Sequence, residues 1–280
     1  MLFVSPHIRR LIDLALDEDD LGFDATSAAF FTGESASAYL LAKQDLVVSG
    51  LEVARASYAR VDPSVEWAPL VEDGSRVARG ELIGRVRGPA ASVLRGERVA
   101  LNFLQRMCGV ATKTAAYVEA LGNEKVRLVD TRKTLPGWRE LDKYAVRCGG
   151  GHNHRYALSG GVMVKDNHIA AAGSVAEAVR RVREVMPHTL RVEVEATTIG
   201  EVEDALSAGA EIIMLDNMAT SMMREAAARI RADPRDVVIE VSGNVTLERL
   251  GELGTLDIDV VSTGAITHSV PASDISMKFD

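Results

Sequence analysis

The sequence is poor in cysteine and carries no net positive charge. Its two cysteines, Cys108 and Cys148, are too few for a disulfide framework, and no CxxC or His/Cys spacing marks a zinc site. The formal net charge of -8 and the sequence pI near 5.4 argue against a protein that binds nucleic acid. We therefore expect packed thiols, no zinc and no nucleic-acid partner.

The chain also lacks a long apolar run. Although 47% of its residues are apolar, no stretch is long enough to cross a bilayer. The opening MLFVSPHIRRLIDLALDEDD has no basic amino-terminal region, no continuous apolar core and no small-residue cleavage site, so it does not resemble a secretion signal. We expect a cytoplasmic protein without a membrane partner, long enough for one large domain and a small one.

What the chain does have is a local concentration of basic residues. The segment from Asp130 to His168 contains ten Lys, Arg and His residues and four acidic ones. A basic cluster in an acidic chain indicates an anionic ligand. Glycines at 149–151 and 160–161 interrupt the cations, as suits loops that close around a small ligand. The pattern predicts a small polyanion rather than nucleic acid.

The second half alternates apolar, β-branched runs with helical segments. Such alternation predicts parallel strands joined by crossover helices, and the absence of a Rossmann glycine fingerprint favours a barrel over a doubly wound sheet. Helix start signals occur at Ser174 with Glu177 and at Thr198 with Glu201, and Gly209 is placed to end the second helix. The six predicted strands end at Asp130, Lys165, Glu195, Asp216, Ser242 and Ser262. In a barrel, the active site lies where these polar residues fall.

The first part of the chain has a different pattern. Residues 36–53 and 64–94 mix alternating runs with turn signals such as Asp73-Gly74, which indicates antiparallel strands and hairpins. Residues 96–121 repeat apolar side chains at helical spacing and could bridge two domains. We therefore expect a separate α+β domain before the barrel.

Three acidic residues suggest a cation site. Glu193 and Glu195 lie two apart on one predicted strand and so share a face. On a sheet surface they would simply be solvated, but inward carboxylates of a wrapped parallel set need a cation, above all the terminal Glu195. Asp216 ends the next strand, where an ordinary helix start would look the same. Together, Glu195 and Asp216 predict a magnesium site that is completed by substrate phosphates.

The basic residues differ in how strongly each one predicts contact with a ligand. Lys165 closes an apolar strand, where a lysine is hard to solvate, so it is predicted to face a ligand. His154 and Arg155 follow three glycines. Such a pair alone rarely marks a binding site, and only the neighbouring basic residues support a ligand-binding role for it. Lys143 and Arg147, four residues apart, predict a solvated helix face.

Small residues follow the last two predicted strands. The loops are Ser242-Gly243-Asn244 and residues 262–265, STGA. Small side chains let backbone amides approach an oxyanion, and the loops after late barrel strands often bind a phosphate. The residues alone thus describe a site for magnesium, a phosphate and a second anionic compound.

Seven segments, in the same order along the chain, match one known family. They are ERVALNFLQRMCGVAT at 97–112, DTRKTLPGWRELDKYAVRCGGGHNHR at 130–155, VKDNHI at 164–169, EVEAT at 193–197, LDN at 215–217, SGN at 242–244 and THSVPASDIS at 267–276. With these segments the chain resembles quinolinate phosphoribosyltransferase, also called nicotinate-nucleotide pyrophosphorylase (carboxylating). The resemblance implies an N-terminal α/β sandwich over residues 1–109, joined by the tail 270–280, and an incomplete parallel α/β barrel over residues 110–269. It also implies a homodimer with shared active sites, with a hexamer left open.

The resemblance implies a reaction and a role for each matching residue. Quinolinate and phosphoribosyl pyrophosphate would give nicotinate mononucleotide, pyrophosphate and carbon dioxide in de novo NAD biosynthesis, with Mg²⁺. Glu195 and Asp216 would hold the metal and the ribose hydroxyls, and, with Lys133 and Lys165, would be catalytic. The anion pocket would comprise Arg132, Lys133, His154, Arg155, Lys165 and, from the other subunit, Arg98. The 5′-phosphate would take Ser242, Gly243, Asn244, Ser262 and Gly264, and His268 would approach the pyrophosphate.

Three other functions compete with this one. A nicotinate phosphoribosyltransferase or a molybdenum-transport-associated relative would share the phosphosugar site yet need fewer cations for its acceptor. An aldolase using Lys165 as a Schiff-base nucleophile would fit a barrel strand end but leaves Glu195, Asp216 and the phosphate loops unexplained. A nucleic-acid-binding protein conflicts with the acidic pI and would show steeply salt-dependent binding.

Overall fold

The computed structural model describes residues 2–19 and 24–280. Its contacts divide the chain into two compact units. The first unit comprises residues 1–115, 134–150 and 267–280, and the second comprises residues 116–133 and 151–266. The predicted domain boundary at 109/110 falls inside a helix, α4 (Ala90–Leu121), which contributes residues to both units.

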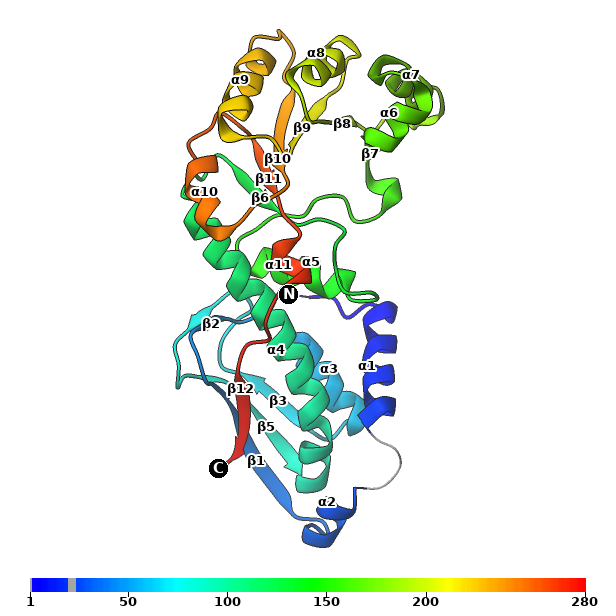
Figure 1. The fold of residues 1–280 in the computed structure, drawn as a ribbon. Helices are drawn as coiled ribbons and strands as arrows, with labels where there is room; N and C mark the ends of the chain where they lie inside the picture. Colours follow the sequence, from blue (N-terminus) through cyan, green and yellow to red (C-terminus); the bar gives the residue numbers. More distant parts are fainter. Residues whose placement is uncertain (1, 20–23) are drawn as a thin grey trace. The chain divides into compact units, whose positions relative to one another are not determined.

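The second unit is built on a six-stranded sheet whose neighbouring strands are all parallel (Figure 1). The spatial order is β6-β11-β10-β9-β8-β7, so the edges are the first two of these strands in the sequence. Each predicted strand is confirmed at its predicted place. The strands are β6 (Arg127–Val129), β7 (Val162–Val164), β8 (Val192–Ala196), β9 (Ile212–Asp216), β10 (Val238–Ser242) and β11 (Val260–Ser262).

Helices connect these strands, and both predicted N-caps are confirmed, although only the second is a complete capping box because the Glu177 carboxylate is bonded to Arg180 and Arg181. Ser174 Oγ accepts a hydrogen bond from Glu177 N at 3.1 Å, and Thr198 with Glu201 forms a reciprocal capping box. Gly209 follows the second of these helices with φ +78°, a left-handed conformation that favours glycine. The helices are α6 (Asp166–Ala172), α7 (Val175–Val185), α8 (Ile199–Ser207), α9 (Thr220–Arg231) and α10 (Leu247–Leu253), with a 3₁₀ turn at Leu158–Gly160. Helix α11 (Ala265–His268) follows β11, and the chain passes into the first unit within it.

The first unit is an antiparallel sheet with helices packed against it. Its four strands run in the order β12-β1-β5-β3, and a separate pair joins β2 (Leu46–Val47) to β4 (Arg76–Val77). The C-terminal strand pairs with β1, so the tail of the chain belongs to this sheet. The bounds are β1 (Ser35–Ala42), β3 (Glu66–Pro69), β5 (Leu82–Pro89), β12 (Ile275–Phe279), α1 (Pro6–Asp19), α2 (Ala25–Phe30), α3 (Leu51–Val61) and α5 (Arg139–Cys148).

The core of the first unit lies between its sheet and helices α3 and α4. Leu40 of β1 and Val86 of β5 are fully buried there with Leu104 of α4. Tyr58 of α3 is also fully buried, and a Cβ atom on Gly96 of α4 would lie 2.6 Å from its ring. Gly96 therefore permits close packing inside the helix, which begins at Ala90 and not at Gly96 as its composition predicted.

Lys143 and Arg147 were predicted to form a solvated helix face on α5, and only Arg147 is exposed. Lys143 is only 1% exposed, so the prediction of a solvated Lys143 is wrong. Helix α5 has an unbroken buried run from Leu141 to Val146, and no face of that turn is open to water. Arg147 is exposed, with its guanidinium 5.5 Å from the centre of the Tyr144 ring.

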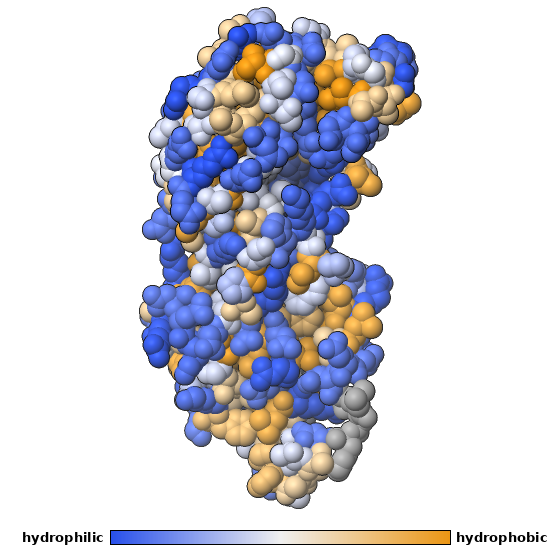
Figure 2. Space-filling model, viewed as in Figure 1, coloured by the Kyte–Doolittle hydropathy of each residue, from blue (hydrophilic) through white to orange (hydrophobic). Residues whose placement is uncertain are grey.

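The surface and the helix lengths bear on the membrane question. No helix among the described residues is long and apolar enough to span a membrane. Figure 2 shows a face that is mostly hydrophilic, with smaller hydrophobic groups between the charged residues.

Candidate active site

A cavity of about 510 Å³ opens at the carboxyl ends of the parallel strands in the second unit. The strand ends β8, β9 and β10 supply its acidic and small residues, and the segments after β6 and β7 supply its cations. The predicted residues that line it are Arg132, Lys133, His154, Arg155, Lys165, Glu195, Asp216, Ser242, Gly243, Asn244 and Ser262. Residues from or directly after all six strand ends, separated by as many as 130 positions in sequence, therefore share one cavity.

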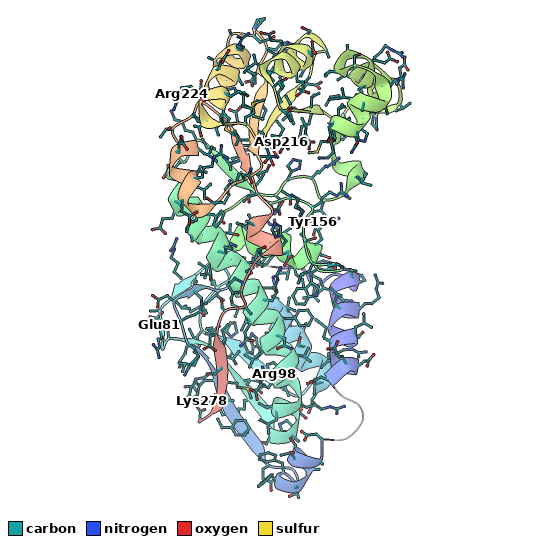
Figure 3. The ribbon with its side chains drawn as sticks, in the orientation of Figure 1. Glu81, Arg98, Tyr156, Asp216, Arg224 and Lys278 are labelled. Carbon is teal, nitrogen blue, oxygen red and sulfur yellow. The ribbon has the colours of Figure 1, made fainter. Side chains whose placement is uncertain are left out.

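Glu195 and Asp216 are brought together by the pairing of β8 with β9. The register places Glu195 opposite Met214, two residues before Asp216, so both carboxylates emerge at one end of the sheet. Figure 3 labels Asp216 at the end of its strand. One oxygen of each is engaged: Glu195 Oε1 pairs with Lys165 Nζ, and Asp216 Oδ2 accepts from Asn217 Nδ2 at 2.8 Å. Among the described residues no partner is seen for the second oxygens, a donor set that suits a hard cation.

Asp130 orders the segment that carries the cations His154 and Arg155. It is fully buried at the end of β6. Its Oδ1 accepts from His154 N at 2.9 Å, and its Oδ2 accepts from Asn153 Nδ2 at 2.7 Å. A parallel bridge between Val129 and His152 holds the start of the same segment beside β6. The glycine-rich loop therefore ends in a fixed position, with its basic residues at the cavity.

The cations of the cavity are held in different ways. Arg155 donates from Nη1 to Gly161 O at 2.7 Å, which fixes its side chain along the loop before β7. Burial lowers the pKa of Arg155, and the positive charge of Arg132 lowers it further. Lys133 is exposed, and its backbone N donates to Thr131 Oγ1 at 3.0 Å. An anionic ligand would relieve the repulsion between the two arginines.

The two small-residue loops differ in their exposure to the cavity. Ser242, Gly243 and Asn244 all line it, with Gly243 at φ +79° and Asn244 at φ +49°. Ser262 lines it as well, whereas Gly264 is buried and is not among the lining residues. The proposed phosphate role of Gly264 stays a prediction.

Four residues of the cavity were not singled out from the sequence. Met163 and Met214 add an apolar wall, and Thr131 and Asn217 add polar groups. Methionines inside apolar strands look like ordinary core residues, so no sequence signal marks them. Thr131 and Asn217 directly follow Asp130 and Asp216, and their place after a strand end was the available signal.

Arg98 and His268 belong to the first unit and are described with it. Arg98 is exposed on α4 (Figure 3). His268 is exposed at the end of α11, where its Nδ1 lies 2.6 Å from Ser269 Oγ. The roles implied for both residues stay predictions.

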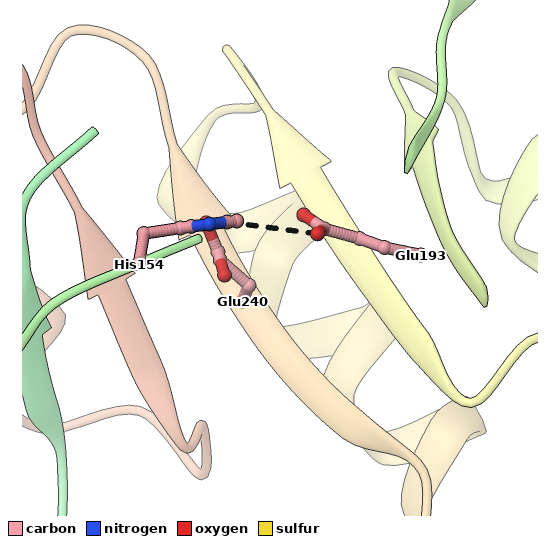
Figure 4. A group of neighbouring side chains, drawn as sticks. All are labelled: His154, Glu193 and Glu240. Carbon is pink, nitrogen blue, oxygen red and sulfur yellow. Dashed lines mark ion pairs between the residues drawn. The ribbon is translucent and has the colours of Figure 1, made fainter. Parts of the chain in front are cut away.

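A buried acidic cluster shares His154 with the cavity (Figure 4). Glu193 of β8 and Glu240 of β10 are each 4% exposed, and each has one carboxylate oxygen without a hydrogen-bond partner among the described residues. His154 Nε2 lies 3.5 Å from Glu193 Oε2 and 3.6 Å from Glu240 Oε1. These groups also line a second cavity, of about 470 Å³, that extends toward the amino ends of the strands.

The cluster has the composition of a metal site, but the histidine is oriented as a donor. Ligand atoms of all three residues lie within 4.8 Å of one another. However, His154 Nδ1 accepts from Arg155 N at 2.6 Å, so in the neutral ring the proton sits on Nε2 and points at the two carboxylates. A protonated Nε2 cannot ligate a metal. The cluster therefore orients the His154 ring, and the magnesium site predicted at Glu195 and Asp216 stays a prediction.

Glu240 provides a pH-dependent test of this cluster. Burial, followed by the charge of Glu193, raises the pKa of Glu240 from 4.5 to about 7, while His154 opposes the shift. The folded protein then holds a proton that the unfolded chain releases, so stability falls as pH rises between about 4.5 and 7. The free energy of unfolding of Glu240→Gln, measured relative to wild type, should therefore increase by on the order of 2 kcal/mol from pH 5 to pH 8.

Urea denaturation of both proteins at the two pH values measures this difference. Glu252→Gln, at an exposed position of α10, is the matched control and should show no such trend. An advantage of Glu240→Gln that stays constant with pH would contradict a proton held by the buried carboxyl.

Comparison with known proteins places the chain in a family. The family model for the quinolinate phosphoribosyl transferase N-terminal domain matches residues 20–108, and that for its C-terminal domain matches residues 110–278. The chain is 40% identical over 270 residues to a probable nicotinate-nucleotide pyrophosphorylase [carboxylating] of Bacillus subtilis, covering 96% of this chain and 92% of the relative. It is 41% identical over 293 residues to the Nicotiana tabacum quinolinate phosphoribosyltransferase [decarboxylating] 1b, covering 98% and 82%. The crystal structure of NadC from Streptococcus pyogenes matches with a TM-score of 0.94 and 41% identity, covering 99% of this chain and 98% of that one. The chain therefore belongs to the quinolinate phosphoribosyl transferase family and is a phosphoribosyltransferase of this type.

Proposed function

We propose that this chain transfers the phosphoribosyl group of phosphoribosyl pyrophosphate to quinolinate, with loss of carbon dioxide, to give nicotinate mononucleotide and pyrophosphate. One observation carries the proposal: a single cavity combines a cationic wall with two carboxylates and a small-residue loop on adjacent strand ends. The family names of the relatives agree with this reaction.

Quinolinate has two adjacent carboxylates, which matches the cationic wall. Arg132, Arg155 and Lys133 line the cavity together with Lys165. Guanidinium groups bind carboxylates through two parallel hydrogen bonds, so arginines can neutralise both acidic groups and also orient the ring. An acceptor with one carboxylate, such as nicotinate, would leave part of this positive charge uncompensated.

The phosphosugar would occupy the side of the cavity formed by β8, β9 and β10. Glu195 and Asp216 would hold Mg²⁺ and the ribose hydroxyls, and the loop Ser242 to Asn244 would receive the 5′-phosphate. When bound, the metal would take up charge on the departing pyrophosphate. By family resemblance, His268 approaches the same leaving group.

The chemistry then requires positioning and charge rather than a covalent enzyme intermediate. The quinolinate ring nitrogen forms a bond to ribose C1 while the bond from C1 to the pyrophosphate oxygen breaks, and its electron pair leaves with pyrophosphate. Cations around the leaving group stabilise the oxocarbenium-like state. The bond from the ring to the adjacent carboxylate breaks next, its electron pair stays on the ring carbon beside the positive nitrogen, and a proton from water replaces the lost carbon dioxide.

The competing functions find less support in the cavity. Lys165 Nζ forms an ion pair with Glu195, and a Schiff-base mechanism gives no role to Asp216 or to the loop Ser242 to Asn244 in the same cavity. A nicotinate phosphoribosyltransferase would use the same phosphosugar residues, and the acceptor distinguishes the two. The protein is incubated with phosphoribosyl pyrophosphate and Mg²⁺, and with quinolinate or nicotinate as the acceptor. We expect quinolinate to be consumed, with release of nicotinate mononucleotide, pyrophosphate and carbon dioxide. Consumption of nicotinate with quinolinate untouched would overturn the proposal.

A first pair of substitutions tests the two carboxylates. Glu195→Gln and Asp216→Asn should each weaken the Mg²⁺-dependent binding of phosphoribosyl pyrophosphate at least about tenfold, because each removes a charged ligand. Quinolinate binding to the free enzyme should stay largely intact. Isothermal titration calorimetry with each substrate measures both affinities.

Glu252→Gln, at its exposed position on α10, is the control for removal of one negative charge. Should either carboxylate variant lose quinolinate affinity while it keeps normal phosphosugar affinity, the assignment of Glu195 and Asp216 would be wrong.

A second test concerns the dimer implied by the resemblance, in which Arg98 of one subunit completes the active site of the other. Arg98→Ala and Lys133→Ala should each be nearly inactive as homodimers, because each removes a cation from the quinolinate carboxylates. A mixed dimer places both lesions in one site and leaves the other intact. Random reassociation should therefore restore about a quarter of the wild-type activity.

Subunits are mixed by mild unfolding and refolding, and differential tags confirm the mixed dimers before activity is measured. Confirmed mixed dimers with no activity above the parents would mean that Arg98 acts within its own chain.

A further inference from the structure

Two neighbouring strand ends of the cavity turn through left-handed backbone. Asn217, directly after β9, has φ +54°, although it is not a glycine. On the adjacent strand β10, Gly243 has φ +79° and Asn244 has φ +49°. Left-handed residues other than glycine are uncommon and are mostly Asn or Asp, because their short polar side chains bond locally. Asn217 adopts this uncommon conformation between Asp216 at the end of β9 and the loop Ser242 to Asn244 at the end of β10.

Asn217 is bonded to both sides of this junction. Its backbone N donates to Ser242 O at 3.0 Å, which ties the end of β9 to the end of β10. Its side-chain Nδ2 donates to Asp216 Oδ2 at 2.8 Å. One oxygen of the Asp216 carboxylate is thus held within the protein, and Oδ1 is the oxygen that remains for a ligand.

Gly243 lies against the same amide group. A Cβ atom at position 243 would lie 2.2 Å from Asn217 Oδ1 and 2.4 Å from its Cγ. An alanine there would push the amide away, and the donor that holds Asp216 would move with it. The loop with Gly243 and the Asp216 carboxylate are therefore mechanically linked through one side chain.

We propose that Asn217 is a positioning residue for the phosphosugar half of the site. It fixes the rotation of Asp216, so that Oδ1 faces the cavity, and it sets the distance between that carboxylate and the loop Ser242 to Asn244. The role rests on the proposed function, because it assumes that these two groups hold parts of one substrate. No contact of Asn217 with the reacting atoms is required.

The alternative is that Asn217 serves only the backbone turn into helix α9. Asn217→Gly separates the two roles, because glycine keeps the left-handed backbone at little cost and loses only the amide. Asn217→Asp keeps the size and the local turn but replaces the donor with a second carboxylate next to Asp216.

The test measures affinity for phosphoribosyl pyrophosphate in the presence of Mg²⁺, and for quinolinate alone, by calorimetry. We expect Asn217→Gly to weaken phosphosugar binding about tenfold, as for loss of a hydrogen bond to a charged group, and Asn217→Asp to weaken it more. Quinolinate affinity and the melting temperature should change little. In steady-state assays, the KM for the phosphosugar should rise more than kcat falls.

Gly243→Ala tests the mechanical link. Its matched control is Gly173→Ala, where glycine has φ +92° and no atom lies within 4 Å of the added Cβ, so only the backbone cost is measured. Gly243→Ala should weaken phosphosugar binding, and Gly173→Ala should not. In the Asn217→Gly background, the added Gly243→Ala should cost clearly less than it does alone, because the clash is gone.

The outcomes separate this role from the proposed function. If the wild-type protein does not bind phosphoribosyl pyrophosphate, the proposed function fails and the positioning role fails with it. If wild type binds and Asn217→Gly binds equally well, only the positioning role is refuted. Strictly additive effects of Asn217→Gly and Gly243→Ala would refute the mechanical link.

Discussion

The site depends on the in-register parallel pairing of β8, β9 and β10. Parallel strands bring their carboxyl ends to the same edge of a sheet, and side chains two residues apart share a face. Ser242 of β10 therefore pairs with Asp216 of β9. Glu195 of β8 pairs with Met214, which lies two residues before Asp216 and so on the same face of β9. A shift of one residue in either pairing would turn a carboxylate out of the cavity and an apolar side chain into it.

Charge balance is the second constraint on this unit. The inner face carries the carboxylates of Glu193, Glu195 and Glu240 near the cations Arg155 and Lys165. The Glu195 carboxylate is paired with Lys165. The carboxylates of Glu193 and Glu240 face Nε2 of His154, whose Nδ1 already accepts a hydrogen bond from Arg155 N. The resulting arrangement keeps the histidine ring fixed, and the cations Arg132, Lys133 and Arg155 line the same cavity.

Much of this arrangement was predictable from the sequence, because strand ends and capping residues are local signals. The alternation of apolar runs with the Ser174 and Thr198 caps located all six strands of the parallel sheet along the chain. The predicted start of α4 at residue 96 and the predicted exposure of Lys143 are both wrong for a common reason. Each depends on tertiary packing that the local pattern does not contain: Gly96 packs against Tyr58 inside α4, and Lys143 lies in the buried part of α5. The orientation of His154 toward Glu193 and Glu240 is likewise invisible in sequence, since its partners lie on strands far along the chain.

The most direct test of the account is the position of a bound metal in a crystal of the protein with phosphoribosyl pyrophosphate and Mn²⁺ as the substitute for Mg²⁺. Anomalous scattering locates the manganese without reference to the proposed chemistry. The account predicts a peak beside Glu195 and Asp216 Oδ1, in contact with the phosphosugar. A phosphosugar bound with manganese only at the cluster of His154, Glu193 and Glu240, or with no manganese near Asp216, would contradict it.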